Sequence, residues 1–356
     1  MSETIKKENP LPNPDEKTEI KDSAELKKQK TYQIFKRNQL LNDLLPLSGF
    51  IVLFIIYTIV CLANGYTYTD YLWATFDRGV FIALMSIGAS FLFTLGQFDM
   101  SLGSAMGLSA CVGLLVYMST GNIALSIISC ILGAMLVALC NILFSSVLRV
   151  PIFIMSIAMM TVLQQVILAF ITTFGEKGSS QINLSPNPFY GTFMQTNQFR
   201  LMIIILYFLF CLVIFRFLKF GRKAKFLGGN PFCARLTGIS GRRNSIIAFL
   251  LCAIGVGLTA ICYIGESPTV TSATGSTYGM DIMVAIVIGG MPMSGGARSK
   301  ITAPLIGSFT LAFLEELLRA FPATSGEGMI QIFKAILFIG LVYASSRSYR
   351  TSTLPR

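Results

Sequence analysis

The sequence predicts an all-α integral membrane protein with about ten transmembrane helices, some of which are discontinuous. Three observations support this fold class: the composition, a series of long apolar runs, and the clustering of cations between those runs. Hydrophobic residues make up 53% of the 356 positions and charged residues 13%, whereas soluble domains carry about 25% charged residues. The mean hydropathy is +0.67. A helix needs about 20 apolar residues to cross a bilayer, and most of the runs approach that length.

The first element in chain order is a polar segment, residues 1–40, which is charged and poor in aromatic residues. Such a segment cannot bury enough apolar surface to offset the entropy cost of ordering, so we expect a disordered cytoplasmic N-terminal tail. It is too polar before its first apolar run to be a cleaved signal peptide. Lys36 and Arg37 directly precede that run and predict that this end is cytoplasmic.

Ten apolar runs follow, and we expect each to form a membrane helix. They cover about residues 44–63, 79–96, 105–118, 123–143, 151–174, 201–218, 245–264, 282–288, 303–318 and 329–344. Residues 64–78 are rich in tyrosine and contain the single tryptophan, Trp73, which predicts an external loop at the membrane interface. Residues 175–199 predict the longest loop between spans, and residues 265–280 a further outer loop.

The Lys and Arg residues, which give the chain a net charge of +11, gather on one side of this arrangement. Outside the N-terminal tail, the clustered cations are Arg149, Lys219, Arg222, Lys223, Lys225, Arg235, Arg242, Arg243, Arg298, Lys300, Arg347, Arg350 and Arg356. This clustering follows the positive-inside rule and predicts that both termini lie in the cytoplasm. Because the cations lie between apolar runs rather than on a soluble face, we expect no nucleic acid partner.

Several functional classes are excluded or disfavoured by what the sequence lacks. It contains no histidine, which removes His-based catalysis and His metal sites. The eight cysteines form no CxxC pair and mostly lie inside apolar runs, so we interpret them as small apolar core residues. We therefore expect no catalytic residues and no metal site. A phosphate-binding loop of the form Gly-x-x-x-x-Gly-Lys followed by Ser or Thr is also absent, so the chain cannot bind a nucleotide in that way.

The most informative stretch is residues 278–314, where an apolar helix over 282–288 is interrupted before a second helix begins. Its helix-breaking residues are Gly289, Gly290, Pro292, Gly295 and Gly296. A first half this short cannot cross a bilayer. Broken backbone at membrane depth is tolerated where it is buried in protein or lines a cavity, and it often marks a transport pathway. The alternative is a plain cytoplasmic hairpin with Gly-rich turns.

A second break, GQFDMSLGS at residues 96–104, places Asp99 between two apolar runs. A lone aspartate in a bilayer costs roughly 2.5–3.5 kcal/mol and needs a polar partner or a cavity. Asp99 could simply cap the following helix, or it could also face the pathway, and these two readings are compatible. The order of apolar run, Asp and Gly/Ser-rich break recurs loosely at residues 281–296, which suggests an internal repeat.

The basic segment 219–244 carries more than topology signals. It contains a Gly-Gly-Asn-Pro turn and then a short amphipathic stretch, residues 232–236. A solvated loop that only sets topology is one interpretation. Docking to a partner better explains an apolar-faced helix in this position.

Three motifs together resemble the permease subunits of bacterial ATP-binding cassette (ABC) importers of the ribose, xylose and galactose type, which group with the branched-chain amino acid permeases. FDMSLGS at 98–104 is similar to the family's hydrophobic-Asp-Leu-Ser-Val-Gly-Ser. FLGGNPFCARLTGIS at 226–240 resembles its coupling segment, and AIVIGGMPMSGGARSKITAPLIG at 285–307 resembles its second Gly-rich motif. The resemblance implies a permease domain over about residues 44–346 and a cytoplasmic C-terminal tail over 347–356.

Family membership implies two ATP-binding cassette ATPase subunits, an extracytoplasmic substrate-binding protein, and a second permease subunit, either the same chain or a paralogue. The implied ATPase-docking positions are Gly228, Gly229, Asn230, Ala234, Arg235, Gly238 and Ile239. The implied pathway positions are Gln97, Phe98, Asp99, Ser101, Gly289, Gly290, Ser294, Gly295 and Gly296.

The expected function is therefore import of a neutral hydroxylated solute, most concretely a monosaccharide, across the bacterial cytoplasmic membrane as a multi-pass subunit embedded in the lipid bilayer. We expect no cofactor in this chain, since ATP would bind the partner subunit. The alternative is an ion-coupled secondary transporter, for which the membrane carboxylates are Asp99, Asp281, Glu315 and Glu316. Lys334, in the last run, could snorkel to the interface or pair with one of the two glutamates.

Overall fold

The computed structural model describes residues 46–62, 68–175, 178–184, 189, 192–321 and 326–350. The predicted N-terminal tail, residues 1–40, lies outside these ranges, as do residues 351–356 of the predicted C-terminal tail. The last helix continues to Arg350. Everything below concerns the helical unit that begins at Pro46.

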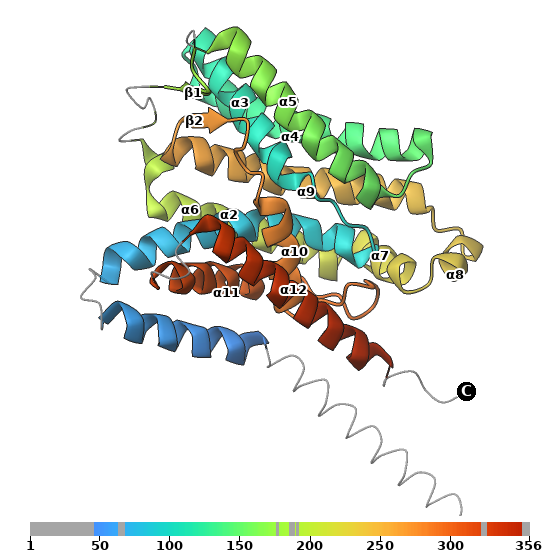
Figure 1. Ribbon diagram of the computed structural model, residues 1–356. Helices are drawn as coiled ribbons and strands as arrows, with labels where there is room; N and C mark the ends of the chain where they lie inside the picture. The colour runs from blue at the N-terminus through green and yellow to red at the C-terminus, as the bar shows by residue number, and fades with distance from the viewer. Residues whose placement is uncertain are drawn as a thin grey trace, which may run out of the picture. The chain divides into compact units, whose positions relative to one another are not determined.

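The described residues are almost entirely helical, as predicted (Figure 1). After a first helix, Pro46–Leu62, the long helices are α2 (Tyr68–Thr94), α3 (Leu102–Thr120), α4 (Ile123–Leu148), α5 (Ile152–Phe174), α6 (Asn197–Arg216), α9 (Gly241–Glu266), α11 (Thr302–Arg319) and α12 (Glu327–Arg350). The shorter ones are η1 (Phe193–Gln195), α7 (Lys219–Gly229), α8 (Pro231–Leu236) and α10 (Tyr278–Ile288).

Six of the described helices are long and apolar enough to cross a membrane: α2 from Leu72, α3, α4, α5, α6 and α9. Pro46–Leu62 and α10 are apolar but shorter. The two remaining runs, α11 and α12, contain buried ionised residues, which are described below. Each of the ten predicted apolar runs is thus helical, and the fold class of a helical membrane protein is confirmed.

The predicted external loop at 64–78 is wrong from Tyr68 onward, because α2 begins there and includes Trp73. The aromatic residues from Tyr68 onward that favoured a loop are part of this helix, and its charged residues Asp77 and Arg78 are paired within the helical unit. Asp77 accepts an ion-pair contact from Arg200 of α6, and the Arg78 guanidinium lies 3.5 Å from the Glu316 carboxylate of α11. A charged residue that finds a partner on a neighbouring helix does not end its own helix.

A small two-stranded sheet interrupts the all-α prediction. Strands β1 (Gln181–Asn183) and β2 (Thr269–Thr271) pair antiparallel, with Ile182 opposite Val270. Both strands lie in segments that we expected to be loops. Ile182 and Val270 are buried, so the sheet closes the core at the end of the unit where α5 and α9 finish.

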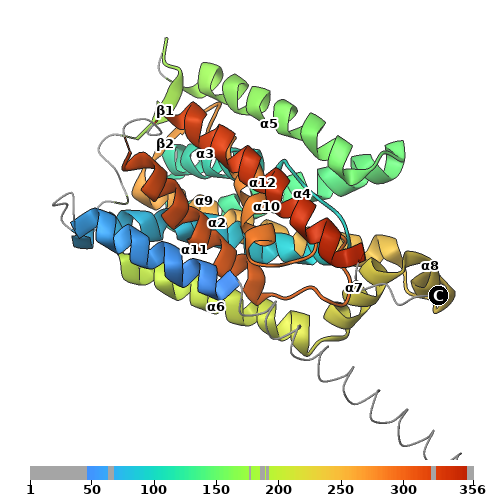
Figure 2. The same ribbon diagram turned by 60° about the horizontal axis from the view of Figure 1, so that its bottom comes forward.

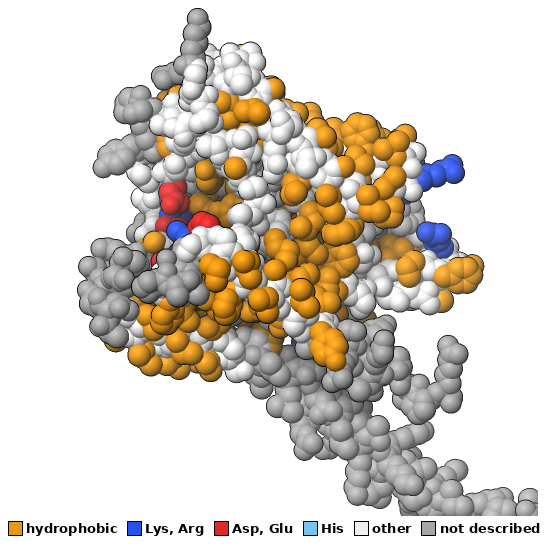
Figure 3. Space-filling model, viewed as in Figure 1, with side chains coloured by type: hydrophobic (Ala, Val, Ile, Leu, Met, Phe, Trp, Pro, Cys, Tyr) orange, Lys and Arg blue, Asp and Glu red, His pale blue; other side chains and the backbone are white. Residues whose placement is uncertain are grey.

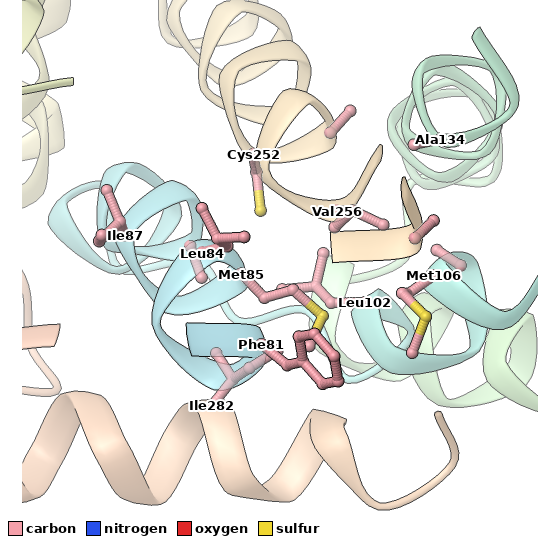
Figure 4. Packing of buried hydrophobic residues seen from close by; sticks show 14 of the residues in the cluster. Phe81, Leu84, Met85, Ile87, Leu102, Met106, Ala134, Cys252, Val256 and Ile282 are labelled. Atoms are coloured by element: carbon pink, nitrogen blue, oxygen red, sulfur yellow. The ribbon is translucent and has the colours of Figure 1, made fainter. Parts of the chain in front are cut away.

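The core centres on α2 and α9, which pack along each other and against α3, α4 and α11. Figure 4 shows apolar side chains of α2, α3, α4, α9 and α10 converging on this core, among them Phe81, Met106 and Val256. A Cβ on Gly88 would lie 2.8 Å from the Cα of Cys252, and one on Gly255 would lie 2.5 Å from the carbonyl oxygen of Leu84. These glycines let the two backbones approach closely, as small residues do in membrane helix pairs.

The outer helices turn apolar side chains outward. Leu132 and Leu136 of α4 are more than half exposed, and Figure 3 shows apolar side chains covering the middle of one face, with cationic side chains at one end. An exposed apolar belt of this kind suits lipid. The cysteines within the described ranges are all unpaired, and six of the eight are buried, which confirms their interpretation as core residues.

Candidate functional site

The first candidate segment is the connection between α2 and α3. Asp99 is 4% exposed. Its Oδ1 accepts hydrogen bonds from the backbone N–H of Ser101 (2.8 Å) and from the Ser101 hydroxyl (2.6 Å). Its Oδ2 accepts a bond of 3.0 Å from the amide of Asn141. Asp99 therefore orders the residue before α3 and also ties this connection to α4.

Sequence reasoning missed Asn141, although a signal was present. It is an isolated amide within the apolar run 123–143, and polar residues inside membrane helices usually have a specific partner. Its Nδ2 also donates to the Ser101 hydroxyl at 2.8 Å. Its Oδ1 is buried and has no hydrogen-bond partner among the described residues.

Gln97 and Phe98 sit at the start of the same connection. The Gln97 amide donates to the Ser245 hydroxyl of α9 at 2.7 Å, while its Oε1 is buried and unpartnered within the described part of the chain. The Phe98 ring meets the Phe93 ring edge to face at 4.7 Å. The connection is thus held by α2, α4 and α9 together.

The second candidate segment is the connection between α10 and α11. Helix α10 has 11 residues and ends at Ile288, with Gly289 at its C-cap, so the predicted break is confirmed. Gly290, Gly295 and Gly296 have positive φ angles of 85°, 69° and 86°, which favour glycine. Ser294 is exposed, whereas Met291 is buried. The connection is therefore packed against protein and is not a plain exposed turn.

The structure brings the two predicted breaks together. The Gly296 N–H donates to the carbonyl oxygen of Thr94 at 3.0 Å. A Cβ on Gly295 would lie 2.9 Å from the backbone nitrogen of Gly96. Near the α3 end of the α2–α3 connection, Gly279 of α10 packs so closely on the carbonyl oxygen of Met100 that a side chain on Gly279 would overlap it. The Gly295–Gly296 end of the second break therefore lies against the start of the first one, whereas Gly289 packs on Ala303 of α11 and Gly290 on Pro46.

The predicted docking segment forms two short helices, α7 and α8, at the end of the unit where α2 finishes (Figure 2). Asn230 caps α8, because its Oδ1 accepts from the backbone N–H groups of Phe232 (3.1 Å) and Cys233 (3.0 Å). Gly238 ends the segment with a φ of 77°.

The two faces of α8 differ in exposure. Ala234 faces inward and is buried, while Phe232 and Leu236 are 71% and 74% exposed. Arg235 is also exposed, and Ile239 is half-buried. Two large apolar side chains beside an arginine at a polar end of the molecule are typical of a protein-binding surface.

A buried ionic cluster joins α10, α11 and α12. The Lys334 ammonium lies 2.5 Å from the Asp281 carboxylate and 2.9 Å from the Glu315 carboxylate. The predicted pairing of Lys334 with a glutamate is confirmed for Glu315, whereas Asp281 was not expected to join it. Three buried ionised groups from three helices hold the short helix α10 in place.

A second ionic cluster, missed at the sequence level, lies at the end where α2 begins. Arg200 of α6 is buried and contacts both Asp77 of α2 and Glu266 of α9, the latter at 3.6 Å. Figure 3 shows acidic and basic side chains gathered at this end. The signal was the single arginine at the start of an apolar run, which in a membrane helix requires an acidic partner.

Comparison with known proteins adds to this geometry. Residues 73–344 match the family described as "Branched-chain amino acid transport system / permease component". The chain is 26% identical over 274 residues to the ribose import permease protein RbsC of Escherichia coli (strain K12), covering 73% of this chain and 81% of that protein. It is 24% identical over 328 residues to the ribose import permease protein RbsC of Haemophilus influenzae, covering 85% and 94% respectively.

The galactose/methyl galactoside import permease protein MglC of Escherichia coli (strain K12) is 26% identical over 235 residues, which cover 61% of this chain and 70% of that protein. No solved structure matches the chain. The family match covers most of the described helices and the three motifs that carried the resemblance, so the predicted relationship is confirmed. The chain belongs to the branched-chain amino acid transport system permease component family, and it is a multi-pass transport subunit of an ABC importer rather than an enzyme.

Proposed function

We propose that this permease carries a neutral, hydroxyl-rich solute of the monosaccharide class into a bacterial cell. The observation that carries the proposal is the chemistry of the α2–α3 connection. It offers the carboxylate of Asp99, the hydroxyl of Ser101 and the amide of Gln97, and the Asn141 amide of α4 lies beside them. Among the described residues, no lysine or arginine bonds to this group. A pathway past these groups would suit hydroxyl donors and acceptors better than an anionic solute.

The names of the relatives support the same substrate class. They are a ribose import permease and a galactose/methyl galactoside import permease, and both kinds of cargo are neutral and rich in hydroxyl groups. Ion-coupled transport loses its main support, because an ABC permease takes its energy from an ATPase partner. Three of the four carboxylates that had suggested ion coupling have cationic partners: Asp281 and Glu315 bind Lys334, and Glu316 binds Arg78. The fourth, Asp99, accepts hydrogen bonds from Ser101 and Asn141.

The proposed ATPase-docking surface consists of α7 and α8, with Phe232 and Leu236 as its apolar contacts and Arg235 as its charged one. The cations of α7 support a cytoplasmic position for this end under the positive-inside rule, and we propose the same side for both termini. The extracytoplasmic substrate-binding protein would then meet the opposite end, which carries the β1–β2 sheet and the Arg200 cluster.

The second permease subunit fits the outward face of α5. Gln165, near the middle of this helix, is exposed among apolar neighbours, and within the described ranges nothing hydrogen-bonds its amide. It lines a shallow hollow of about 360 Å³ together with Thr161, Val162, Val166 and Ala169. An amide facing lipid without partners costs several kcal/mol. A second copy of the chain, presenting its own Gln165 across a two-fold axis, would satisfy both amides.

The experiment that tests the proposal uses the purified complex. The permease would be isolated with its co-purifying ATPase and placed in proteoliposomes, and uptake of labelled ribose, xylose, galactose and leucine would be measured with the cognate binding protein outside. We expect ATP-dependent uptake of one sugar and none of leucine. Uptake of leucine instead, or sugar uptake driven by an ion gradient without the ATPase, would contradict the proposal.

A further inference from the structure

We propose that a glycine junction, made of Thr94, Gly228, Gly295 and Gly296, transmits the movement of the docking helices α7 and α8 to the two broken connections of the pathway. The inference rests on the proposed function, since it takes α7 and α8 to be the surface that binds the ATPase. The inference goes beyond the proposed function by naming the backbone contact through which the ATPase acts on the pathway.

The first part of the junction is the meeting of α7 with the end of α2. Gly228 is in the last turn of α7. A Cβ on Gly228 would overlap the carbonyl oxygen of Thr94, the last residue of α2, and would lie 2.8 Å from the backbone nitrogen of Gly296. Real Cβ atoms are not found this close to other atoms, so only glycine allows the two helix ends to touch backbone to backbone.

The second part is the loop after α10, which lies on the same two helix ends. Gly296 is buried, and its N–H donates to the Thr94 carbonyl oxygen at 3.0 Å. A Cβ on Gly296 would lie 3.0 Å from the Cα of Gly229, and one on Gly295 would lie 2.5 Å from the carbonyl oxygen of Phe93. Three segments that are distant in sequence therefore meet without any side chain between them.

The other end of α7 is fixed as well. A Cβ on Gly221 would overlap the Phe215 carbonyl oxygen at the end of α6, and the Lys225 ammonium lies 4.4 Å from the centre of the Phe215 ring. Burial lowers the pKa of Lys225, and the nearby Arg216 lowers it further. Helix α7 is thus a short rigid segment, held at α6 by one end and at the junction by the other.

These contacts explain how docking can reach the pathway. A packed side chain can absorb a displacement by changing rotamer, whereas a backbone-to-backbone contact cannot. A shift of α7 must therefore move Thr94 and Gly296 together. Thr94 begins the connection that contains Asp99, and Gly296 ends the Gly-rich break after α10. One displacement at the docking surface thus reaches both broken connections.

The matched pair of variants Gly228→Ala and Gly340→Ala tests this. Both glycines are helical, so each change brings the same gain in helix propensity. The added methyl group of Gly340→Ala, in α12, meets nothing within 4 Å, whereas that of Gly228→Ala forces the junction apart. Because Gly228 also belongs to the proposed docking segment, uptake is expressed per ATP hydrolysed by the ATPase that stays bound. We expect this ratio to fall at least about fivefold in Gly228→Ala, the low end of a typical coupling effect. Gly340→Ala should match the wild type in bound ATPase, ATP hydrolysis and uptake.

Normal uptake by Gly228→Ala, or an equal loss of uptake in both variants, would overturn the junction while leaving the proposed function intact. If the wild type itself bound no ATPase, the proposed function would fail, and this inference with it. Co-purification of the ATPase therefore separates the two failures.

Hydrogen–deuterium exchange on the wild-type complex gives a test that needs no variant, should Gly228→Ala fail to fold. We expect a non-hydrolysable ATP analogue to change amide exchange in the peptides that cover 226–237 and 292–299 together, because the Gly296 N–H bonds to Thr94. A change confined to 226–237 would overturn the inference.

Discussion

Asp99 is a buried carboxylate whose hydrogen bonds, among the described residues, come from neutral donors alone. Two of them belong to Ser101 and one to Asn141. Burying an ion in this way is costly unless several donors compensate it. The three donors offset part of this cost, and what they leave uncompensated supports our proposal that Asp99 lies on the pathway.

The Asp99→Asn variant should accumulate in the membrane as the wild type does but transport its solute more slowly. The new amide can be accommodated because the Asn141 side chain can turn its unpartnered Oδ1 toward it. What is lost is the charge that faces the connection. Uptake and membrane abundance, measured on the same cells, check this. Unchanged uptake would leave Asp99 with only its role in ordering the start of α3.

Asn141→Leu, unlike Asp99→Asn, should lower the stability and the membrane abundance of the protein. It leaves the Asp99 Oδ2 buried without a donor, which costs about 1–3 kcal/mol. We expect a lower thermal midpoint in detergent and less protein in the membrane. A variant as stable as the wild type would show that Asp99 does not depend on this bond.

At the scale of elements, the main finding is how a helix too short to cross the bilayer is held. Helix α10 has 11 residues and is fixed by the Lys334 cluster with α11 and α12, by Gly279 against the α2–α3 connection, and by the Gly-rich loop against Thr94. Helix α10, which interrupts the membrane span, is thus held by contacts with α11, with α12 and with both broken connections. This is the burial in protein that a broken helix at membrane depth needs.

Lys334→Met should destabilise the protein by about 3–5 kcal/mol, because it leaves two buried carboxylates without their cation. Arg319→Gln is the matched control. It breaks the pair with Glu327, whose carboxylate is 68% exposed, and should cost roughly 0–1 kcal/mol. Thermal unfolding of both variants in one detergent measures the difference. Equal losses would mean that the Lys334 cluster contributes no more than a surface ion pair.

Restoring the charge balance gives a second check on this cluster. The triple variant Lys334→Met, Asp281→Asn, Glu315→Gln removes the stranded charges along with the cation, so it should regain much of the lost thermal midpoint. No recovery would indicate that the packing of the Lys334 chain, and not its charge, holds α10.

At the scale of the whole molecule, the buried helices α2 and α9 form the centre and the outer helices present apolar faces to lipid. Only a few polar side chains break these faces in the middle of a span, and Gln165 of α5 is one of them. Such a residue is expensive in lipid and is best explained by contact with another chain.

Gln165→Leu should shift the permease from dimer toward monomer in native mass spectrometry from mild detergent. The variant replaces the amide that a second copy would satisfy with a side chain that lipid accepts equally well. Thr172→Val on the same helix is the control, because the Thr172 hydroxyl already donates to the Ala169 carbonyl oxygen at 3.0 Å. A dimer unaffected by Gln165→Leu would move the interface to another face.

Local patterns in the sequence were sufficient to predict the helices, the two breaks and the family. Apolar runs located the helices, and glycine and proline located both breaks, because these signals depend on neighbouring residues alone. The three motifs were sufficient for the family. The start of α2 was misjudged, because the tyrosines and Trp73 of residues 64–78 suited an interfacial loop, whereas α2 begins at Tyr68 and includes Trp73.

The sequence by itself therefore determined the fold class, the helix-breaking positions and the transport family of this protein. Only the tertiary structure decided that Asn141 holds Asp99, that Arg200 and Lys334 each bind two carboxylates, that β1 and β2 pair, and that Gly228 and Gly296 meet at Thr94. The physical reason is that each of these contacts joins residues far apart in the chain. Their spacing carries no periodicity, so the contacts follow from how the helices pack and not from the order of the residues.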